Sequence, residues 1–159
     1  MTTFAGVAGQ AGSADGAASV ARFIMPEGIA VDRHDNIFVA DYGNHTVRLI
    51  KPSGVVSTLA GVAGQAGSAD GPGAEARFRR PQGIAVDRAG RVYVSDTGNH
   101  TLRRISTAGH VTTVAGAAGQ EGSVDGWGAA ARLSDPAGLA VRANGSLDMG
   151  GSCTIRSVR

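Results

Sequence analysis

The chain has 159 residues, of which 25 are Gly and 4% are aromatic. Its 42% hydrophobic content is too high for a disordered chain, and its formal net charge of +2 is too small to indicate nucleic-acid binding by itself. Cys153 is the only cysteine, which excludes an internal disulfide and a zinc site built on several cysteines. Residues 1–6 carry neither the basic region nor the long apolar run of a signal peptide, so we expect a soluble chain, cytoplasmic by default and without a membrane contact.

Three copies of one unit make up the sequence, which we expect to form a single domain over residues 1–159. The segment at residues 5–16 recurs without a change at 60–71 and in altered form at 115–126, so successive copies are offset by 55 residues. The repeat units are therefore about 5–59, 60–114 and 115–159.

Each unit shows the signals of four short β-strands. In the first unit these runs of Val, Ile, Thr and aromatic residues cover residues 28–32, 36–41, 46–50 and 55–59. The turns between them are too short for parallel crossover connections, so the strands form an antiparallel meander. A repeated four-stranded meander predicts an all-β fold in which each unit is one blade of a β-propeller.

The first unit contains the segments PEGIAVD at 26–32, IFVAD at 37–41 and NHTVR at 44–48, and the second unit has matching segments at 81–87, 92–96 and 99–103. These segments resemble the NHL repeat, a propeller blade named for its Asn-His-Leu motif. The resemblance covers nearly the whole chain and implies three four-stranded NHL-type blades. The third unit departs from it after Leu147, where two residues are missing together with the Asp, Asn and His of the motif.

The three units predict an incomplete ring, because propellers close with about four to eight blades. Residues 2–6 resemble the fourth strand of a blade, whereas the third unit stops at its third strand, 154–158. We therefore expect two chains to form one six-bladed ring as a homodimer, with residues 2–6 of each chain completing the last blade of the other. The alternative is that the chain is a fragment of a longer propeller and that its ends have no such role.

Strand parity places the Gly-rich connectors on the same face as the turns at residues 41–45 and 96–100. Long loops on a rigid scaffold are where binding residues concentrate, so this face is the candidate binding surface. The candidate binding residues on it are Arg79, Arg80 and Trp127.

Two histidines, His45 and His100, recur in the turns and raise the question of a metal site. Such a site usually needs three or more protein ligands, and neither turn brings a third convergent ligand of its own. We therefore expect no metal and no cofactor, and we expect the turn residues to act as caps that bond to backbone groups. These structural turn residues are Asp41, Asn44, His45, Asp96, Asn99 and His100.

An Asp and an Arg seven residues apart recur in each connector. We expect each pair to form an ion pair that holds the connector against its blade. The expected pairs are Asp15 with Arg22, Asp70 with Arg77, and Asp125 with Arg132.

The repeated sequence predicts a non-catalytic scaffold that binds an unidentified protein or small ligand on the connector face. One alternative is a metal-dependent lyase or lactonase-like enzyme with a site at the propeller axis, as in an amidating lyase whose propeller resembles these repeats. A second alternative is RNA binding on an arginine-bearing face that includes Arg79, Arg80, Arg103 and Arg104. The small net charge and the few aromatic residues disfavour this second alternative.

Overall fold

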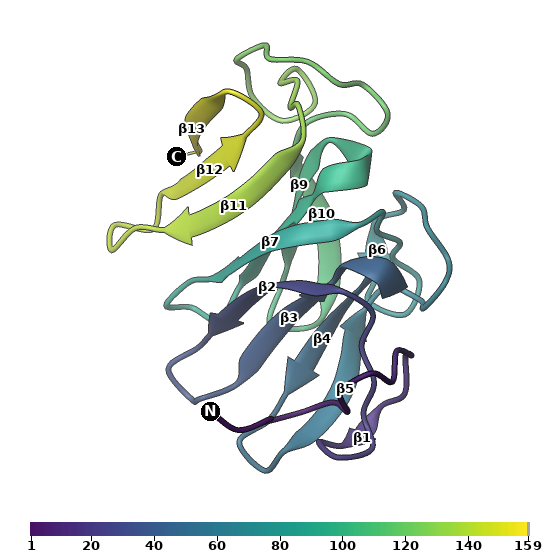
Figure 1. The fold of residues 1–159 in the computed structure, drawn as a ribbon. Coiled ribbons are helices and arrows are strands. Elements are labelled where there is room, and N and C mark those ends of the chain that lie inside the picture. The colour runs from purple at the N-terminus through teal and green to yellow at the C-terminus, as the bar shows by residue number, and fades with distance from the viewer. Residues whose placement is uncertain (159) are drawn as a thin grey trace.

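The computed structural model describes residues 1–158, which form three antiparallel sheets arranged side by side in an open arc (Figure 1). Blade 1 contains β1 (Gly16–Ala17), β2 (Pro26–Val31), β3 (Ile37–Asp41), β4 (Thr46–Ile50) and β5 (Val55–Ala60). Blade 2 contains β6 (Gly71–Pro72), β7 (Pro81–Val86), β8 (Val92–Asp96), β9 (Thr101–Ile105) and β10 (His110–Ala115). Blade 3 contains β11 (Pro136–Val141), β12 (Leu147–Gly151) and β13 (Thr154–Val158).

The prediction of an all-β chain with propeller-like blades is confirmed, because each unit folds into an antiparallel meander at the expected strands. Two short strands were not expected. β1 and β6 belong to the Gly-rich connectors and pair with the outer strands β5 and β10, so blades 1 and 2 each have five strands. Blade 3 has three strands among the described residues, and residues 1–15 form no strand.

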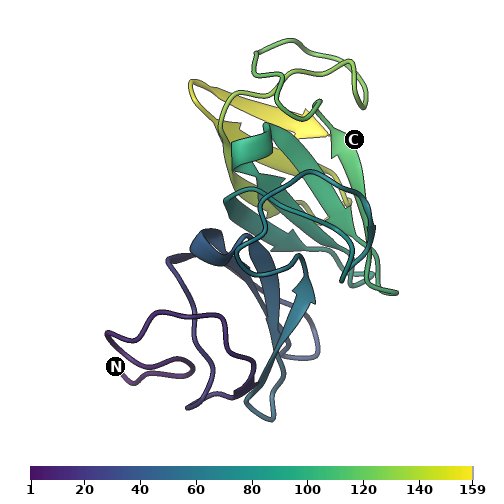
Figure 2. The ribbon, with the colours of Figure 1, turned by 90° about the vertical axis from the view of Figure 1, so that its right-hand side faces the viewer.

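The connectors and the turns that carry the recurring histidines lie on the same side of the arc. Short 3-10 helices, η1 (Tyr42–Asn44) and η2 (Thr97–Asn99), form these turns and lie toward the right in Figure 1, whereas the β2–β3, β7–β8 and β11–β12 turns lie at the left. Figure 2 brings the connectors to the front. The second connector (residues 61–80) and the third (residues 116–135) each donate a backbone hydrogen bond to the preceding turn, from Gly64 to Asn44 and from Gly119 to Asn99.

Apolar side chains fill the space between neighbouring blades. One buried cluster joins blade 1 to blade 2 and includes Phe38, Val47, Phe78, Ile84 and Val94. A second joins blade 2 to blade 3 and includes Ala85, Leu102, Leu133, Leu147 and Met149. The blades are therefore held together mainly by burial of apolar surface between their sheets.

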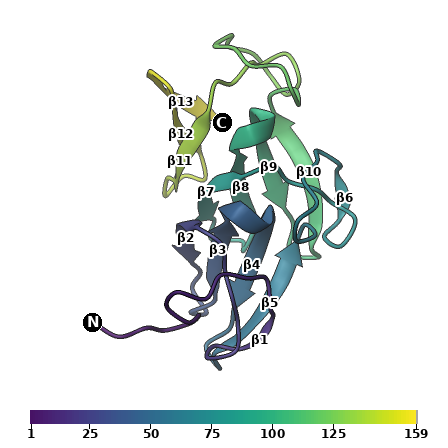
Figure 3. The ribbon, with the colours of Figure 1, turned by 45° about the vertical axis from the view of Figure 1, so that its right-hand side comes forward.

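The outer sheet faces at the two ends of the arc are exposed, whereas the matching faces between neighbouring blades are buried. Ile29 is 65% exposed, whereas Ile84 at the matching position of blade 2 is 5% exposed. Ile155 is 85% exposed, whereas the matching Leu102 is fully buried. Figure 3 shows the N-terminal segment beside blade 1 and the C-terminal strand in blade 3, at opposite ends of the arc. Residues 1–158 contain no helix that is long and apolar enough to cross a membrane.

The innermost strands β2, β7 and β11 approach each other closely at two glycines. A Cβ atom on Gly28 would overlap the carbonyl oxygen of Gln82, and one on Gly83 would overlap the carbonyl oxygen of Ala137. The backbone of the next blade therefore leaves no room for a side chain at these positions.

Replacement of Gly83 with Ala is expected to lower the free energy of unfolding by about 1–3 kcal/mol, because blade 3 must shift away from blade 2. Urea denaturation measures this change. Gly150→Ala is the matched control: its Cβ would meet no atom within 4 Å, so we expect a change within about 0.5 kcal/mol. Equal losses in the two variants would contradict the close packing of the inner strands.

Candidate functional site

A fully buried arginine, Arg48 of β4, joins three segments of blade 1. Its guanidinium donates to Asp41 Oδ2 at 2.8 Å, where β3 ends, and to Asp15 Oδ1 at 2.6 Å in the first connector (residues 5–25). It also donates to the carbonyl oxygens of Ala14 and Arg22, both at 2.9 Å. The same guanidinium lies 5.0 Å from the centroid of the Phe23 ring, a cation–π contact.

Blade 2 repeats this arrangement around Arg103, which is also fully buried. Arg103 donates to Asp96 and Asp70, both at 2.8 Å, and lies 5.0 Å from the ring centroid of Phe78. Burial raises the pKa of the Asp96 carboxyl to about 6, against the hydrogen bonds from Asn99, the Arg79 N–H and Arg103 that lower it, so the carboxyl is mainly ionised at neutral pH. Arg103 is therefore no part of an exposed arginine cluster, which corrects one premise of the RNA-binding alternative.

The expected ion pairs within the connectors are wrong. Asp15, Asp70 and Asp125 pair instead with strand arginines, which are Arg48, Arg103 and Arg156. Arg22, Arg77 and Arg132 turn back on their own connectors and donate to backbone carbonyl oxygens one to three residues before them. The physical reason is that each of these guanidinium groups satisfies unpaired carbonyls of its local turn, which leaves the Asp free to reach the blade.

Asp70 shows how a connector carboxylate binds the blade. Besides pairing with Arg103, it accepts hydrogen bonds from the backbone N–H of Thr113, at 2.9 Å, and from the Thr113 hydroxyl, at 3.0 Å. These bonds and the charge of Arg103 lower the pKa of Asp70, although burial opposes them as the largest single influence. One carboxylate therefore fastens the connector to both β9 and β10.

The Asp and Asn of each turn also bind backbone groups of the connector. Asp41 accepts a hydrogen bond from the Ile24 N–H, and Asn44 donates to Asp41 and to the carbonyl oxygen of Gly12. In blade 2, Asp96 and Asn99 make the matching bonds to the Arg79 N–H and to the carbonyl oxygen of Gly67. These polar side chains are therefore occupied in holding the connectors.

Blade 3 keeps only part of this network. Gly151 occupies the position of Asp96, and a two-residue turn, Ser152 and Cys153, replaces the four residues that include Asn99 and His100. Arg156 still donates to the carbonyl oxygens of Arg132 and Val124 and pairs with the exposed Asp125. It has lost the buried carboxylate partner that Arg103 has.

His45 contacts the start of blade 2 through a single backbone bond. Its backbone adopts the left-handed conformation at φ 60°, and its Nδ1 accepts a hydrogen bond from the Arg80 N–H at 3.1 Å. Burial lowers the pKa of His45, as do the nearby charges of Arg80 and Arg79. Both arginines are exposed, and the Arg80 guanidinium lies 5.9 Å from the ring centroid of Tyr42.

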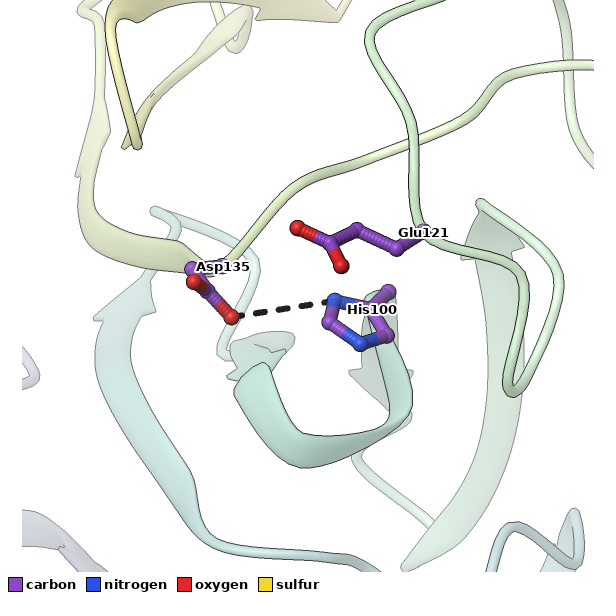
Figure 4. Close-up of side chains that lie close together, drawn as sticks. All are labelled: His100, Glu121 and Asp135. Atoms are coloured by element: carbon purple, nitrogen blue, oxygen red, sulfur yellow. Dashed lines mark ion pairs between the residues drawn. The ribbon is translucent and has the colours of Figure 1, made fainter.

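His100 has the same backbone conformation, at φ 55°, but different neighbours. Glu121 of the third connector and Asp135 at the entry to blade 3 approach its imidazole, and one ligand atom from each of the three residues lies within 4.8 Å of the others (Figure 4). His100 Nδ1 lies 3.8 Å from Asp135 Oδ1. The turn itself supplies no further ligand to His100, as expected, but Glu121 and Asp135 approach it from segments outside the turn.

Trp127 is the remaining candidate binding residue, and it is exposed at the open end of blade 3. It borders a hollow that is also lined by Leu133, Met149, Ile155 and Arg156. Its indole therefore lies near the uncovered sheet face of blade 3.

Residues 23–48 and 78–105 match the model of the NHL repeat. The first two units of the chain therefore contain NHL repeats. It is 39% identical over 82 residues to SUPPRESSOR OF QUENCHING 1 of Arabidopsis thaliana, covering 51% of this chain and 8% of that protein. It is 35% identical over 95 residues to human NHL repeat-containing protein 2, covering 58% of this chain and 13% of the relative. The chain thus spans about a tenth of the length of these curated relatives.

Solved structures of larger chains share the fold. A Bacteroides thetaiotaomicron protein of unknown function superposes with a TM-score of 0.72 at 28% identity, covering 77% of this NHL-repeat chain and 32% of that chain. A gluconolactonase from Xanthomonas campestris has a TM-score of 0.57 at 19% identity, covering 80% and 35%. Virginiamycin B lyase from Staphylococcus aureus has a TM-score of 0.54 at 14% identity, covering 83% and 40%.

The stability of this NHL-repeat chain is expected to depend on the protonation of His45. Because the pKa of His45 is lowered below its ordinary value of 6.5, the unfolded chain binds the proton more readily than the folded chain. The free energy of unfolding should therefore be highest above pH 6.5 and should fall as the pH drops through the folded-state pKa. Protonation of Nδ1 would also break its bond with the Arg80 N–H.

His45→Asn removes this titration while keeping a side-chain acceptor and a residue that tolerates the left-handed conformation. Urea denaturation at about pH 7.5 and about pH 5.5 should show a smaller loss of stability in this variant than in the unaltered chain. His110→Asn, which changes an exposed histidine on β10, should lose as much stability as the unaltered chain. The same loss in all three proteins would contradict the assignment.

Proposed function

We propose that this chain is a non-catalytic binding module that recognises an acidic segment of a protein partner at Arg79 and Arg80. The observation that carries the proposal is a pair of exposed guanidinium groups on a rigid backbone. Within residues 1–158, neither side chain donates a hydrogen bond or forms an ion pair. The Arg79 N–H donates a hydrogen bond to Asp96 at 2.6 Å, and the Arg80 N–H donates one to His45 at 3.1 Å.

The polar residues that recur in blades 1 and 2 support a scaffold rather than an enzyme. The Asp, Asn and Arg of each network are committed to buried hydrogen bonds, whereas exposed groups such as Arg80 and Asp135 differ between matching positions. A lactonase- or lyase-like reaction at the propeller axis is supported by a shared fold with a gluconolactonase and with virginiamycin B lyase, both under 25% identical to this chain. RNA binding has less support than the sequence suggested, because Arg103 is buried.

Binding of a fluorescently labelled penta-glutamate peptide tests the proposed surface. We expect the anisotropy of the peptide to rise with protein concentration and the affinity to fall as salt is added, because exposed charges are screened. The double variant Arg79→Gln with Arg80→Gln should weaken binding by about tenfold, since each lost charge contact contributes about 0.2–1 kcal/mol.

The matched control is Arg33→Gln with Arg88→Gln, which removes two exposed charges from turns on the other side of the arc. It should leave the peptide affinity within about twofold. An equal loss in both double variants would show that only net charge matters and would refute the site. Tighter binding of a labelled oligouridine than of the peptide would favour the RNA alternative instead.

We also propose that two copies of the chain complete a six-bladed ring. Support comes from the repeat geometry. Blade 1 covers Ile84 of blade 2, whereas the matching Ile29 of blade 1 is exposed and would be covered by an equivalent neighbouring blade. Leu102 is likewise covered by blade 3, and the matching Ile155 is not. A second copy would bring Ile155 of the partner subunit against Ile29, twice under one two-fold axis. Apolar faces of this kind are rarely left exposed on soluble monomers.

Light scattering on the purified chain tests the ring. The chain mass is 15.9 kDa, so a dimer of about 32 kDa is expected, and Ile29→Glu or Ile155→Glu should shift it to the monomer. Ala108→Glu places the same charge on an exposed hairpin turn and should leave the dimer intact. A stable monomer of the unaltered chain at micromolar concentration would refute the two-chain ring.

A further inference from the structure

The two NHL turns differ in what reaches the histidine nitrogen. His45 Nδ1 accepts the backbone bond from Arg80, whereas His100 Nδ1 is shielded from solvent and has no hydrogen-bond partner within residues 1–158. A buried imidazole nitrogen without a hydrogen-bond partner is energetically costly, so a ligand bound to this atom would lower the free energy of the folded chain.

Two carboxylates, which are common metal ligands, lie near His100. Glu121 and Asp135 stand where the preceding repeat has Ala66 and Arg80, so both positions gain a carboxylate at this junction. In Figure 4 the two carboxylates approach the imidazole from different segments, the third connector and the start of blade 3. A neutral and a basic residue have thus been replaced by two acidic ones around the nitrogen without a partner.

We propose that His100, Glu121 and Asp135 form a zinc site at the junction of blades 2 and 3. This proposal is independent of the Arg79–Arg80 surface, which lies at the junction of blades 1 and 2. The imidazole nitrogen selects a borderline cation such as Zn²⁺ over Ca²⁺ or Mg²⁺, which take oxygen ligands. With three protein ligands, the fourth tetrahedral position is left to water.

The distances suit a zinc ion after a small closure. Tetrahedral ligands bound at about 2.1 Å lie about 3.4 Å from one another. His100 Nδ1 and Asp135 Oδ1 are already 3.8 Å apart, and all three ligand atoms lie within 4.8 Å. Both carboxylates are on exposed side chains, so rotation about their side-chain bonds can supply the remaining approach.

An outer hydrogen bond already orients one of the ligands. The Ser134 hydroxyl donates to Glu121 Oε1 at 2.6 Å, and it lies 2.9 Å from the Ser152 hydroxyl. Hydrogen bonds to the carboxylate ligands of a metal fix their direction and strengthen binding. Ser134 is therefore a positioning residue for the site.

The site also has a structural use in blade 3. In blades 1 and 2, Asn44 and Asn99 each donate to a glycine carbonyl of the connector, Gly12 and Gly67. Blade 3 has no matching Asn in its shortened turn. A zinc ion would join the third connector to the η2 turn by another route, so its binding should stabilise the degenerate blade.

Isothermal titration with ZnCl₂ tests the site, using untagged Cys153→Ser protein that has been treated with chelator. The Cys153→Ser background removes the exposed thiol as a competing ligand. We expect about one Zn²⁺ per chain and a rise in melting temperature with zinc. Glu121→Gln and Asp135→Asn should each weaken zinc binding by about tenfold or more and abolish the thermal shift. Millimolar Ca²⁺ or Mg²⁺ should not displace the zinc.

The paired variants His100→Asn and His45→Asn separate a site from nonspecific binding. Both replace a histidine in the left-handed conformation with Asn, so their effects on the backbone are matched. His100→Asn should lose the zinc, and His45→Asn should retain it. Equal affinities in the two variants, or zinc binding unchanged in Asp135→Asn and Glu121→Gln, would overturn the proposal, as would absence of zinc binding in the parent protein.

Discussion

The buried pairing of a strand arginine with the aspartate that ends the neighbouring strand is the interaction on which each complete blade depends. Arg48 and Asp41 in blade 1, and Arg103 and Asp96 in blade 2, have no exposed side-chain surface. Removing two charges from water is costly, and hydrogen bonds from other groups to the pair offset part of that cost. The connector supplies further acceptors to each guanidinium, whose Nε alone has no partner within residues 1–158, so removing the connector would destabilise the blade. Connector and blade therefore fold as one unit.

The period of 55 residues made the strands and their order predictable, because runs of Val, Ile and Thr recur between turn residues in the same order. The partners of Asp15 and Asp70 were not predictable in the same way. Arg22 is seven residues from Asp15 in the sequence, whereas Arg48 is 33 residues away. Only the path of the connector around the blade brings the distant arginine closer. The recurrence of an arginine inside an otherwise apolar strand was the available signal, and alternation of polar and apolar residues concealed it.

The histidine turns show a second limit of sequence reasoning. His45 and His100 have the same local motif and the same left-handed backbone, yet one accepts a backbone bond and the other faces two carboxylates. What differs lies in other segments, at positions 66 and 80 in one copy and 121 and 135 in the next. Comparison of the repeat units reveals that Glu121 and Asp135 replace Ala66 and Arg80. Only the packing of the third connector against the η2 turn shows that both carboxylates approach His100.

Blade 3 lacks the buried Asp and the Asn that bind the arginine and the connector in blades 1 and 2. Gly151 supplies no carboxylate to Arg156, whose side chain is 17% exposed, and the shortened turn supplies no Asn to the third connector. Its sheet face is also uncovered at Ile155. Because blade 3 keeps only part of the polar network, contacts along its connector and along its sheet face would stabilise it more than they would stabilise the other blades. The proposed zinc site lies where Glu121 and Asp135 face His100, and the proposed contact with a second chain lies around Ile155, so the two would act on different sides of the same blade.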